Sequence, residues 1–140
     1  QCYWALENGL PVVIHTRNSL KETIKIVSQP EFKDLKGIFH CFDGSYKDAI
    51  KLVDLGFLLG IGGILTFKNS NLRNTIVKIG IEKLVLETDS PYLSPEPYRG
   101  KRNEPSNILY IAEMLEKITT IPLKKISRVT TKNAIELFDL

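Results

Sequence analysis

Four short apolar runs, separated by segments with helical periodicity, constrain the fold of this chain more than any other feature. Each run is continuous and does not alternate with polar residues, which is typical of a strand buried on both faces of a parallel sheet. The runs are "LPVVIHT" from Leu10, "GIFHCF" from Gly37, "GFLLGIGG" from Gly56 and "KLVLETDS" from Lys83. Their spacing predicts an α/β fold of four consecutive βα units.

The intervening segments carry helix signals. "SLKETIKIVS" begins at Ser19 and has Glu22 three residues later, which predicts a capping box. A second helical segment begins at Ser45 and stops at Gly56, a residue type that often ends helices in the left-handed conformation. Two more helices are expected after the last run, in "PSNILYIAEMLEKIT" and "LKKISRVTTKNAIELF". No linker interrupts this order, so we expect residues 1–140 to form a single domain.

The start of the chain predicts that further sequence precedes it. "QCYWALENGLP" has the character of the last turns of a helix that closes at Gly9, with no N-cap ahead of it. Four βα units are also half of an eightfold barrel, a fold that needs about 200 residues or more.

Composition and cysteine content narrow the class of protein. No apolar run approaches the roughly 20 residues that span a bilayer, and the first residues show no signal peptide. Cys2 and Cys41 have neither the number nor the spacing of a disulfide framework or a zinc knuckle, which favours a reducing compartment. We therefore expect a cytoplasmic protein with no membrane association. The net charge of +3 does not by itself indicate nucleic-acid binding.

Polar side chains with metal-ligand chemistry follow three of the apolar runs. His15 and His40, the two histidines of the chain, each end a predicted strand, and Asp89 follows the fourth. Catalytic and binding groups gather at the carboxyl ends of parallel strands. One histidine at a strand end is more often a hydrogen-bonded structural residue. Two histidines and an aspartate along this edge of the sheet, called the rim below, favour a site for a divalent ion.

Three features near these residues are interpreted separately. Glu87 faces the same way as Asp89 if both are on a strand, so the two repel unless a cation or a shared proton lies between them, or unless the strand frays. We interpret Glu87 as a supporting or structural carboxylate. Cys41 is expected on the face opposite His40, as a small buried hydrophobe and not a nucleophile. "GIGG" lacks phosphate-loop spacing, so its glycines are expected to allow a tight turn or a close approach.

Four motifs together resemble one known family. "PVVIHTR", "GIFHCFDGS", "GIGGILTF" and "LVLETDSPYLSPEPYRGKRNEPSNI" are similar, in order and spacing, to the TatD family of metal-dependent deoxyribonucleases, which belongs to the amidohydrolase-like hydrolases. The resemblance covers nearly the whole chain. It implies a TIM-type (β/α)8 barrel of which this chain is the carboxyl-terminal half, strands five to eight. It also implies that His15, His40 and Asp89 bind metal and that Asp89 acts catalytically on the attacking water.

The chain departs from the family pattern in what it lacks. The family has an H-x-H motif on its first strand and a glutamate from its fourth, and this sequence contains neither. A complete family site holds two divalent ions, here Mg, Mn or Zn, and about half of its ligands are present. We therefore expect little activity from this chain alone. We also expect it to pair with the missing amino-terminal half or to self-associate, because an open half-barrel exposes two strand edges.

The expected substrate is DNA, recognised through its phosphates with little sequence specificity. Arg17 lies two residues beyond His15, and Arg99, Arg102 and Asn103 lie in the long loop after the fourth run, where they are predicted to contact phosphate. Tyr92 or Phe42 is a candidate for stacking on a base, although either side chain could belong to the core. The alternatives are a hydrolase of a small amide, lactone or phosphoester, and a catalytically inert half-barrel.

Overall fold

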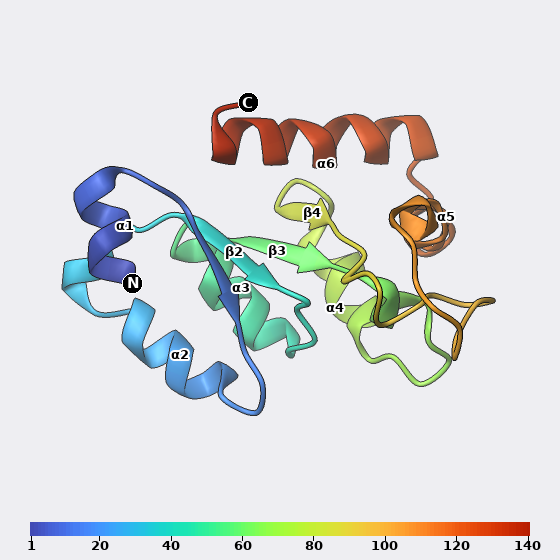
Figure 1. The fold of residues 1–140 in the computed structure, drawn as a ribbon, viewed down its shortest axis with the longest axis horizontal. Helices are drawn as coiled ribbons and strands as arrows, with labels where there is room; N and C mark the ends of the chain where they lie inside the picture. The colour runs from blue at the N-terminus through green and yellow to red at the C-terminus, as the bar shows by residue number, and fades with distance from the viewer.

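A computed structural model describes residues 1–140 and contains one parallel sheet of four strands in the order β1-β2-β3-β4 (Figure 1). Each strand lies within one of the apolar runs. The strands are β1 (Val12–His15), β2 (Gly37–His40), β3 (Leu58–Ile61) and β4 (Leu84–Leu86). Every strand pairs in parallel with the next one along the chain. The predicted α/β fold with four parallel strands is confirmed.

Helices connect the strands and follow the last one. They are α1 (Cys2–Asn8), α2 (Leu20–Val27), α3 (Tyr46–Asp54), α4 (Leu72–Ile79), α5 (Ile108–Thr119) and α6 (Leu123–Phe138), with short 3₁₀ turns η1 (Pro30–Phe32), η2 (Gly63–Thr66) and η3 (Pro105–Asn107). Consecutive helices from α2 to α6 contact one another, and α6 also packs on β4 (Figure 1). None of these helices combines the length and the apolar character needed to cross a membrane.

The hydrophobic core lies between the sheet and the helices. Strand residues alternate between the two faces, and those on the helix side include Phe39, Leu59 and Leu84, all at most 1 % exposed. They belong to one cluster of 21 buried residues that also contains Leu52, Ile76, Ile111 and Ile126 from the helices. Each such side chain contributes about 1.5–3 kcal/mol when it is fully buried. This cluster fixes the strands and therefore the positions of their carboxyl ends.

The opposite face of the sheet carries no helix layer. Val13 and His15 share that face of β1, and in the register they lie beside Ile38 and His40 of β2. Val13 is 59 % exposed, and burial along β1 alternates. The prediction that this run is buried on both faces is therefore wrong for β1, because the strand lies at the edge of the sheet and only one of its faces is covered.

Helix capping differs from the sequence prediction at two positions. Ser19 makes no side-chain capping bond. The capping box is formed instead by Ser45, whose hydroxyl accepts from the backbone N–H of Asp48, while the Asp48 carboxylate accepts from the Ser45 N–H. Gly9 ends α1 with a φ of 64°, as predicted.

Candidate metal centre

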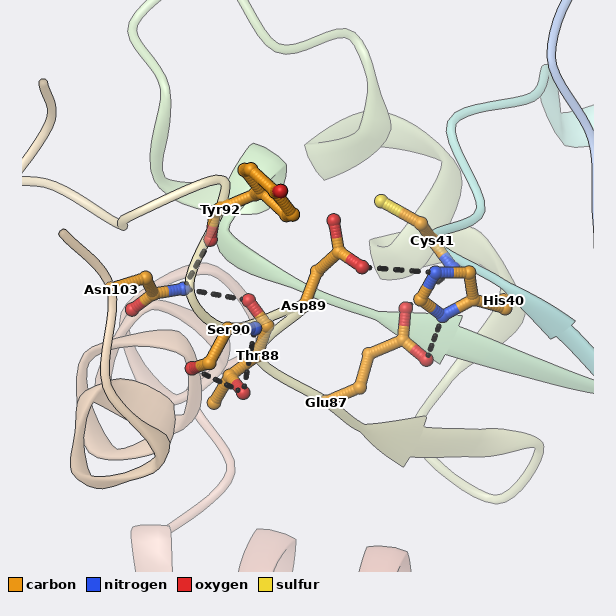
Figure 2. Close-up of polar contacts among 8 residues, drawn as sticks. All are labelled: His40, Cys41, Glu87, Thr88, Asp89, Ser90, Tyr92 and Asn103. Carbon is orange, nitrogen blue, oxygen red and sulfur yellow. Dashed lines mark hydrogen bonds and ion pairs between the residues drawn. The ribbon is translucent and has the colours of Figure 1, made fainter.

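His40 lies between two carboxylates at the end of β2. Its Nδ1 is 3.0 Å from Oε2 of Glu87, and its Nε2 is 3.2 Å from Oδ1 of Asp89. Figure 2 shows the two acidic side chains reaching the imidazole from the segment that follows β4. All three side chains are partly open to solvent, with exposed fractions between 19 % and 31 %. The structure thus brings together His40 and Asp89, two of the three residues predicted to bind metal.

The hydrogen-bonding chemistry of this triad fits a cation. An ionised carboxylate only accepts hydrogen bonds, so Nδ1 must carry a proton to bond with Glu87. In the neutral ring, Nε2 then presents its lone pair to Asp89, and two acceptors face one another. A second proton on the ring or a cation shared by the two groups removes this conflict. Metal-binding histidines usually donate their other ring N–H to a carboxylate or a carbonyl, as His40 does here.

His15 lies beside His40 at the same edge of the sheet. The two residues are register partners in the β1–β2 pair, and their ring centroids are 5.6 Å apart. His15 is exposed, in contrast to the half-buried His40. No group of three or more His, Cys, Asp and Glu side chains is arranged to hold a metal ion in the structure. The role of His15 as a ligand stays a prediction.

Glu87 is held in place by its neighbours. Its Oε1 accepts a hydrogen bond from the backbone N–H of Cys41, and its Oε2 contacts His40. A side chain at Gly60 would collide with it, since a Cβ there would lie 2.4 Å from Oε2. These contacts agree with the interpretation of Glu87 as a supporting carboxylate. They also explain one glycine of the "GIGG" motif as a close-approach position.

Cys41 differs from its predicted position. The chain leaves β2 at His40, and Cys41 has a φ of 51°, so strand alternation no longer decides where its side chain points. The residue is half-buried and lies near the acidic groups, so the prediction of a fully buried side chain on the far face is wrong (Figure 2). Burial raises the pKa of its thiol to about 12, with further contributions from Glu87, Asp89 and Asp43. The neutral thiol is a poor nucleophile, as the sequence predicted.

The loop that carries Asp89 is organised around Asn103, which is 2 % exposed. Its side-chain amide donates hydrogen bonds to the carbonyls of Thr88 and Tyr92, which flank Asp89 and are 2.7 and 2.6 Å away (Figure 2). Its carbonyl oxygen accepts from the backbone of Glu104 and from the side chain of Asn107. Because all four hydrogen bonds of its side chain are made within this loop and the start of the segment that follows it, Asn103 stabilises the loop. Its predicted contact with phosphate stays untested. Sequence reasoning missed the supporting role.

The other predicted substrate-binding residues are exposed on loops that follow β1 and β4. Arg17 lines a small polar cleft with Asp43 and Asp48. Arg99 stacks on the ring of Phe67, with 3.8 Å between its Cζ and the ring centroid, and Arg102 is exposed on the same long loop. Their contacts with phosphate stay predictions. Of the two candidates for base stacking, Phe42 is 3 % exposed and belongs to the core, whereas Tyr92 is 71 % exposed.

A comparison with protein families identifies the chain. The model of the family described as TatD related DNase matches residues 1–139. The chain belongs to the TatD related DNase family. Among TatD relatives, an uncharacterized metal-dependent hydrolase of Buchnera aphidicola subsp. Acyrthosiphon pisum is 47 % identical over 137 residues, covering 97 % of this chain and 52 % of the relative. The uncharacterized metal-dependent hydrolase YcfH of Escherichia coli is 37 % identical, covering 96 % of this chain and 51 % of its own length.

Solved TatD structures share the fold described above. The crystal structure of the TatD homologue YJJV from Escherichia coli superposes with a TM-score of 0.92 at 26 % identity, covering 99 % of this chain and 54 % of that one. A TatD family hydrolase from Entamoeba histolytica gives a TM-score of 0.85 at 25 % identity, covering 98 % of this chain and 54 % of its own. The chain therefore spans about half the length of the curated relatives and solved structures that it matches.

Proposed function

We propose that this chain forms part of a divalent-metal-dependent hydrolase that cleaves phosphodiester bonds in DNA. The observation that carries the proposal is the placement of His40 between Glu87 and Asp89. Membership of the TatD family, and relatives named metal-dependent hydrolases, support the use of a metal. The choice of DNA rests on the family description and on the exposed basic residues in the loops that follow β1 and β4. The proposal covers any of the divalent ions Mg, Mn or Zn.

Each residue of the rim has a defined task in this proposal. His40, Asp89 and His15 would hold the divalent ion, and Glu87 would accept the Nδ1 proton of His40 in a hydrogen bond and so leave the Nε2 lone pair free for it. A bound divalent ion lowers the pKa of a coordinated water and offsets negative charge on phosphate oxygens. Asp89 orients the attacking water and accepts its proton through a carboxylate oxygen. Arg17 and Arg102 bind phosphates of the backbone, which carry no sequence information.

We further propose that the two open edges of the sheet pair with a second half-barrel, supplied by the rest of a longer protein or by another copy. β1 and β4 each leave one edge of the sheet unpaired. Apolar surface accompanies both edges, because Val13 on β1 is 59 % exposed and Leu109 on α5 is 48 % exposed. A cavity of about 630 Å³ between β4, α5 and α6 is lined largely by apolar groups such as Leu86 and Leu123. The chain covers only 52 % of the length of its Buchnera relative, which favours the amino-terminal half of a longer protein as the partner of these edges.

A cleavage assay tests the proposal. The 140-residue chain is assayed on fluorogenic DNA with Mg, Mn or Zn, alone and mixed with the amino-terminal half of the Buchnera relative. We expect weak or no cleavage alone and chelator-sensitive cleavage from the mixture. Asp89→Asn should reduce that cleavage at least about 100-fold, as loss of a catalytic proton acceptor typically does. Asp54→Asn, on the exposed end of α3, is the matched control and should leave it unchanged.

The same assay separates the competing functions. Cleavage that survives both chelator and Asp89→Asn would exclude the metal mechanism. A mixture that hydrolyses a small amide, lactone or phosphoester but leaves DNA intact would keep the metal site and replace the substrate. A correctly folded complex with no hydrolytic activity on any of these substrates would indicate an inert assembly unit.

A further inference from the structure

Asp89 lies in a short arch whose backbone conformation needs support from its surroundings. The arch comprises residues 87–93, and both Asp89, with a φ of 57°, and Leu93, with a φ of 51°, are in the left-handed region. This conformation is uncommon for residues other than glycine, above all for a bulky side chain such as leucine. It persists only where neighbouring groups hold it. The position of the Asp89 carboxylate beside His40 therefore depends on contacts from outside the arch (Figure 2).

The segment that joins β3 to η2 packs against both ends of this arch. At one end, the backbone N–H of Glu87 donates to the carbonyl of Ile61 at 3.1 Å. At the other end, Gly63 lies against Leu93, and an added Cβ on Gly63 would collide with the carbonyl oxygen of Leu93. Glycine at position 63 is thus required for the close approach of the two backbones. One short segment holds the arch at its beginning and at its end.

Thr66 ties η2 to the same loop a second time. The side chain is 3 % exposed. Its hydroxyl donates to the carbonyl of Gly63 at 2.7 Å and accepts from the backbone N–H of Glu96 at 2.9 Å. The hydroxyl therefore closes the turn of η2 and connects it to the residues that follow the arch. A shift of η2 would move the loop that carries Asp89.

Arg73 of α4 holds η2 in place. Its Nε donates to the carbonyl of Leu65 at 3.1 Å, and its Nη2 donates to the carbonyls of Thr66 and Phe67 at 2.9 and 2.8 Å. The last carbonyls of a helix have no partner within it, and a cationic side chain stabilises them. The guanidinium is half-buried and forms no ion pair with a carboxylate. All the hydrogen bonds that it donates end on this one turn.

We propose that Arg73 is a positioning residue for the metal centre. It donates to no residue of the rim and acts through η2, which holds the arch at both ends. Asp89 keeps its place beside His40 because the arch is held in this way. A guanidinium suits the task, since its donors form a rigid fork that fixes several acceptors at once. The inference rests on the proposed function only for the metal, because the contacts of the arch are made by the protein alone.

Backbone amide shifts of the 140-residue chain in chelator test the positioning without metal or activity. Arg73→Met keeps the length of the side chain and removes its donors, so we expect shift changes over residues 61–67 and 87–96. Arg73→Lys keeps the charge and donates from a single nitrogen, so its changes should cover the same residues and be smaller. Val27→Ala truncates a core side chain of α2, a helix that packs beside α3. It should leave residues 87–96 unchanged.

A Mn²⁺ titration separates positioning from a general loss of stability. Broadening of the His40 ring signal should need about three- to tenfold more Mn²⁺ in Arg73→Met than in the wild type, because the residue acts through others. Arg73→Lys should need an intermediate amount. Val27→Ala should lower the urea midpoint yet respond to Mn²⁺ as the wild type does. If Arg73→Met does not fold, Thr66→Val, which removes the hydroxyl link to Glu96, should show the same pattern.

Two results would overturn the proposal. One is a set of changed amides in Arg73→Met that stops at residues 61–67 and leaves residues 87–96 unaltered. The other is Mn²⁺ binding that is unchanged in Arg73→Met, or that falls equally in Arg73→Met and Val27→Ala. A wild-type chain that binds no Mn²⁺ but gives the expected amide pattern would retain the positioning of Asp89 while the proposed function failed.

Discussion

Gly60 on β3 lies directly against the side chain of Glu87, which follows the end of β4. A Cβ added at position 60 would lie 2.4 Å from Oε2 of Glu87, whereas the existing hydrogen leaves room for the carboxylate beside His40. The absence of a side chain at Gly60 of β3 thereby permits Glu87, which follows β4, to reach His40 at the end of β2. The geometry of the rim therefore depends on the missing side chain at Gly60 as well as on its charged residues.

Gly60→Ala should displace Glu87 and destabilise the protein. We expect the free energy of unfolding to fall by about 1–3 kcal/mol, as overpacking of a well-packed site usually costs, measured by urea denaturation. Gly62→Ala is the matched control. Gly62 is extended, with φ −114° and ψ −164°, and its Cβ would meet no atom closer than 3.7 Å. Equal destabilisation by both variants would contradict this account of Gly60.

Glu87→Gln should weaken metal binding while leaving the fold intact. The amide can still accept from the Cys41 N–H, but its NH₂ group then faces Nδ1 of His40 and favours the tautomer that protonates Nε2. The lone pair available to a metal is lost. We expect a 10- to 100-fold lower affinity for Zn or Mn by calorimetry, the range typical of such supporting carboxylates.

Glu113→Gln provides the control for that change. Glu113 is exposed on α5, so the variant removes the same charge away from the rim. Unaltered metal affinity in both variants would show that Glu87 does not set the orientation of His40.

Asn103→Ala should loosen the loop that carries Asp89. The variant removes two donated and two accepted hydrogen bonds from a buried side chain and leaves the carbonyls of Thr88 and Tyr92 without their donor. We expect a loss of about 2–4 kcal/mol in the free energy of unfolding, and faster amide exchange in residues 88–104. Asn74→Ala, on the exposed side of α4, should cost less than about 0.5 kcal/mol. A similar cost for both would rule out a supporting role for Asn103.

The sequence predicted the strands and the rim because both depend on local patterns. Continuous apolar runs marked the four strands, and parallel pairing necessarily brings their carboxyl ends to one edge. His15 and His40 therefore lie together as expected, with their rings 5.6 Å apart. The proximity of Glu87 and Asp89 to His40 followed from the same reasoning, although both lie just beyond β4.

Features set by backbone detail or by distant contacts were not predictable. Ser19 and Ser45 look equivalent in sequence, but Ser45 has the extended φ and ψ of a capping residue, −73° and 166°, whereas Ser19 has −130° and 12°. The role of Asn103 depends on carbonyls 11 and 15 residues away. The exposure of β1 depends on what covers its second face, which no local pattern encodes.

Paramagnetic NMR of the two imidazoles tests the central claim most directly. The chain contains only His15 and His40, so a Mn²⁺ titration reports on the rim through two assignable ring signals. We predict that substoichiometric Mn²⁺ broadens both signals, and that Asp89→Asn shifts this broadening to much higher concentrations while Asp54→Asn does not. Ring signals that stay sharp while Mn²⁺ broadens amides elsewhere, or an Asp89→Asn chain that responds like the wild type, would contradict a metal centre formed by His40 and Asp89.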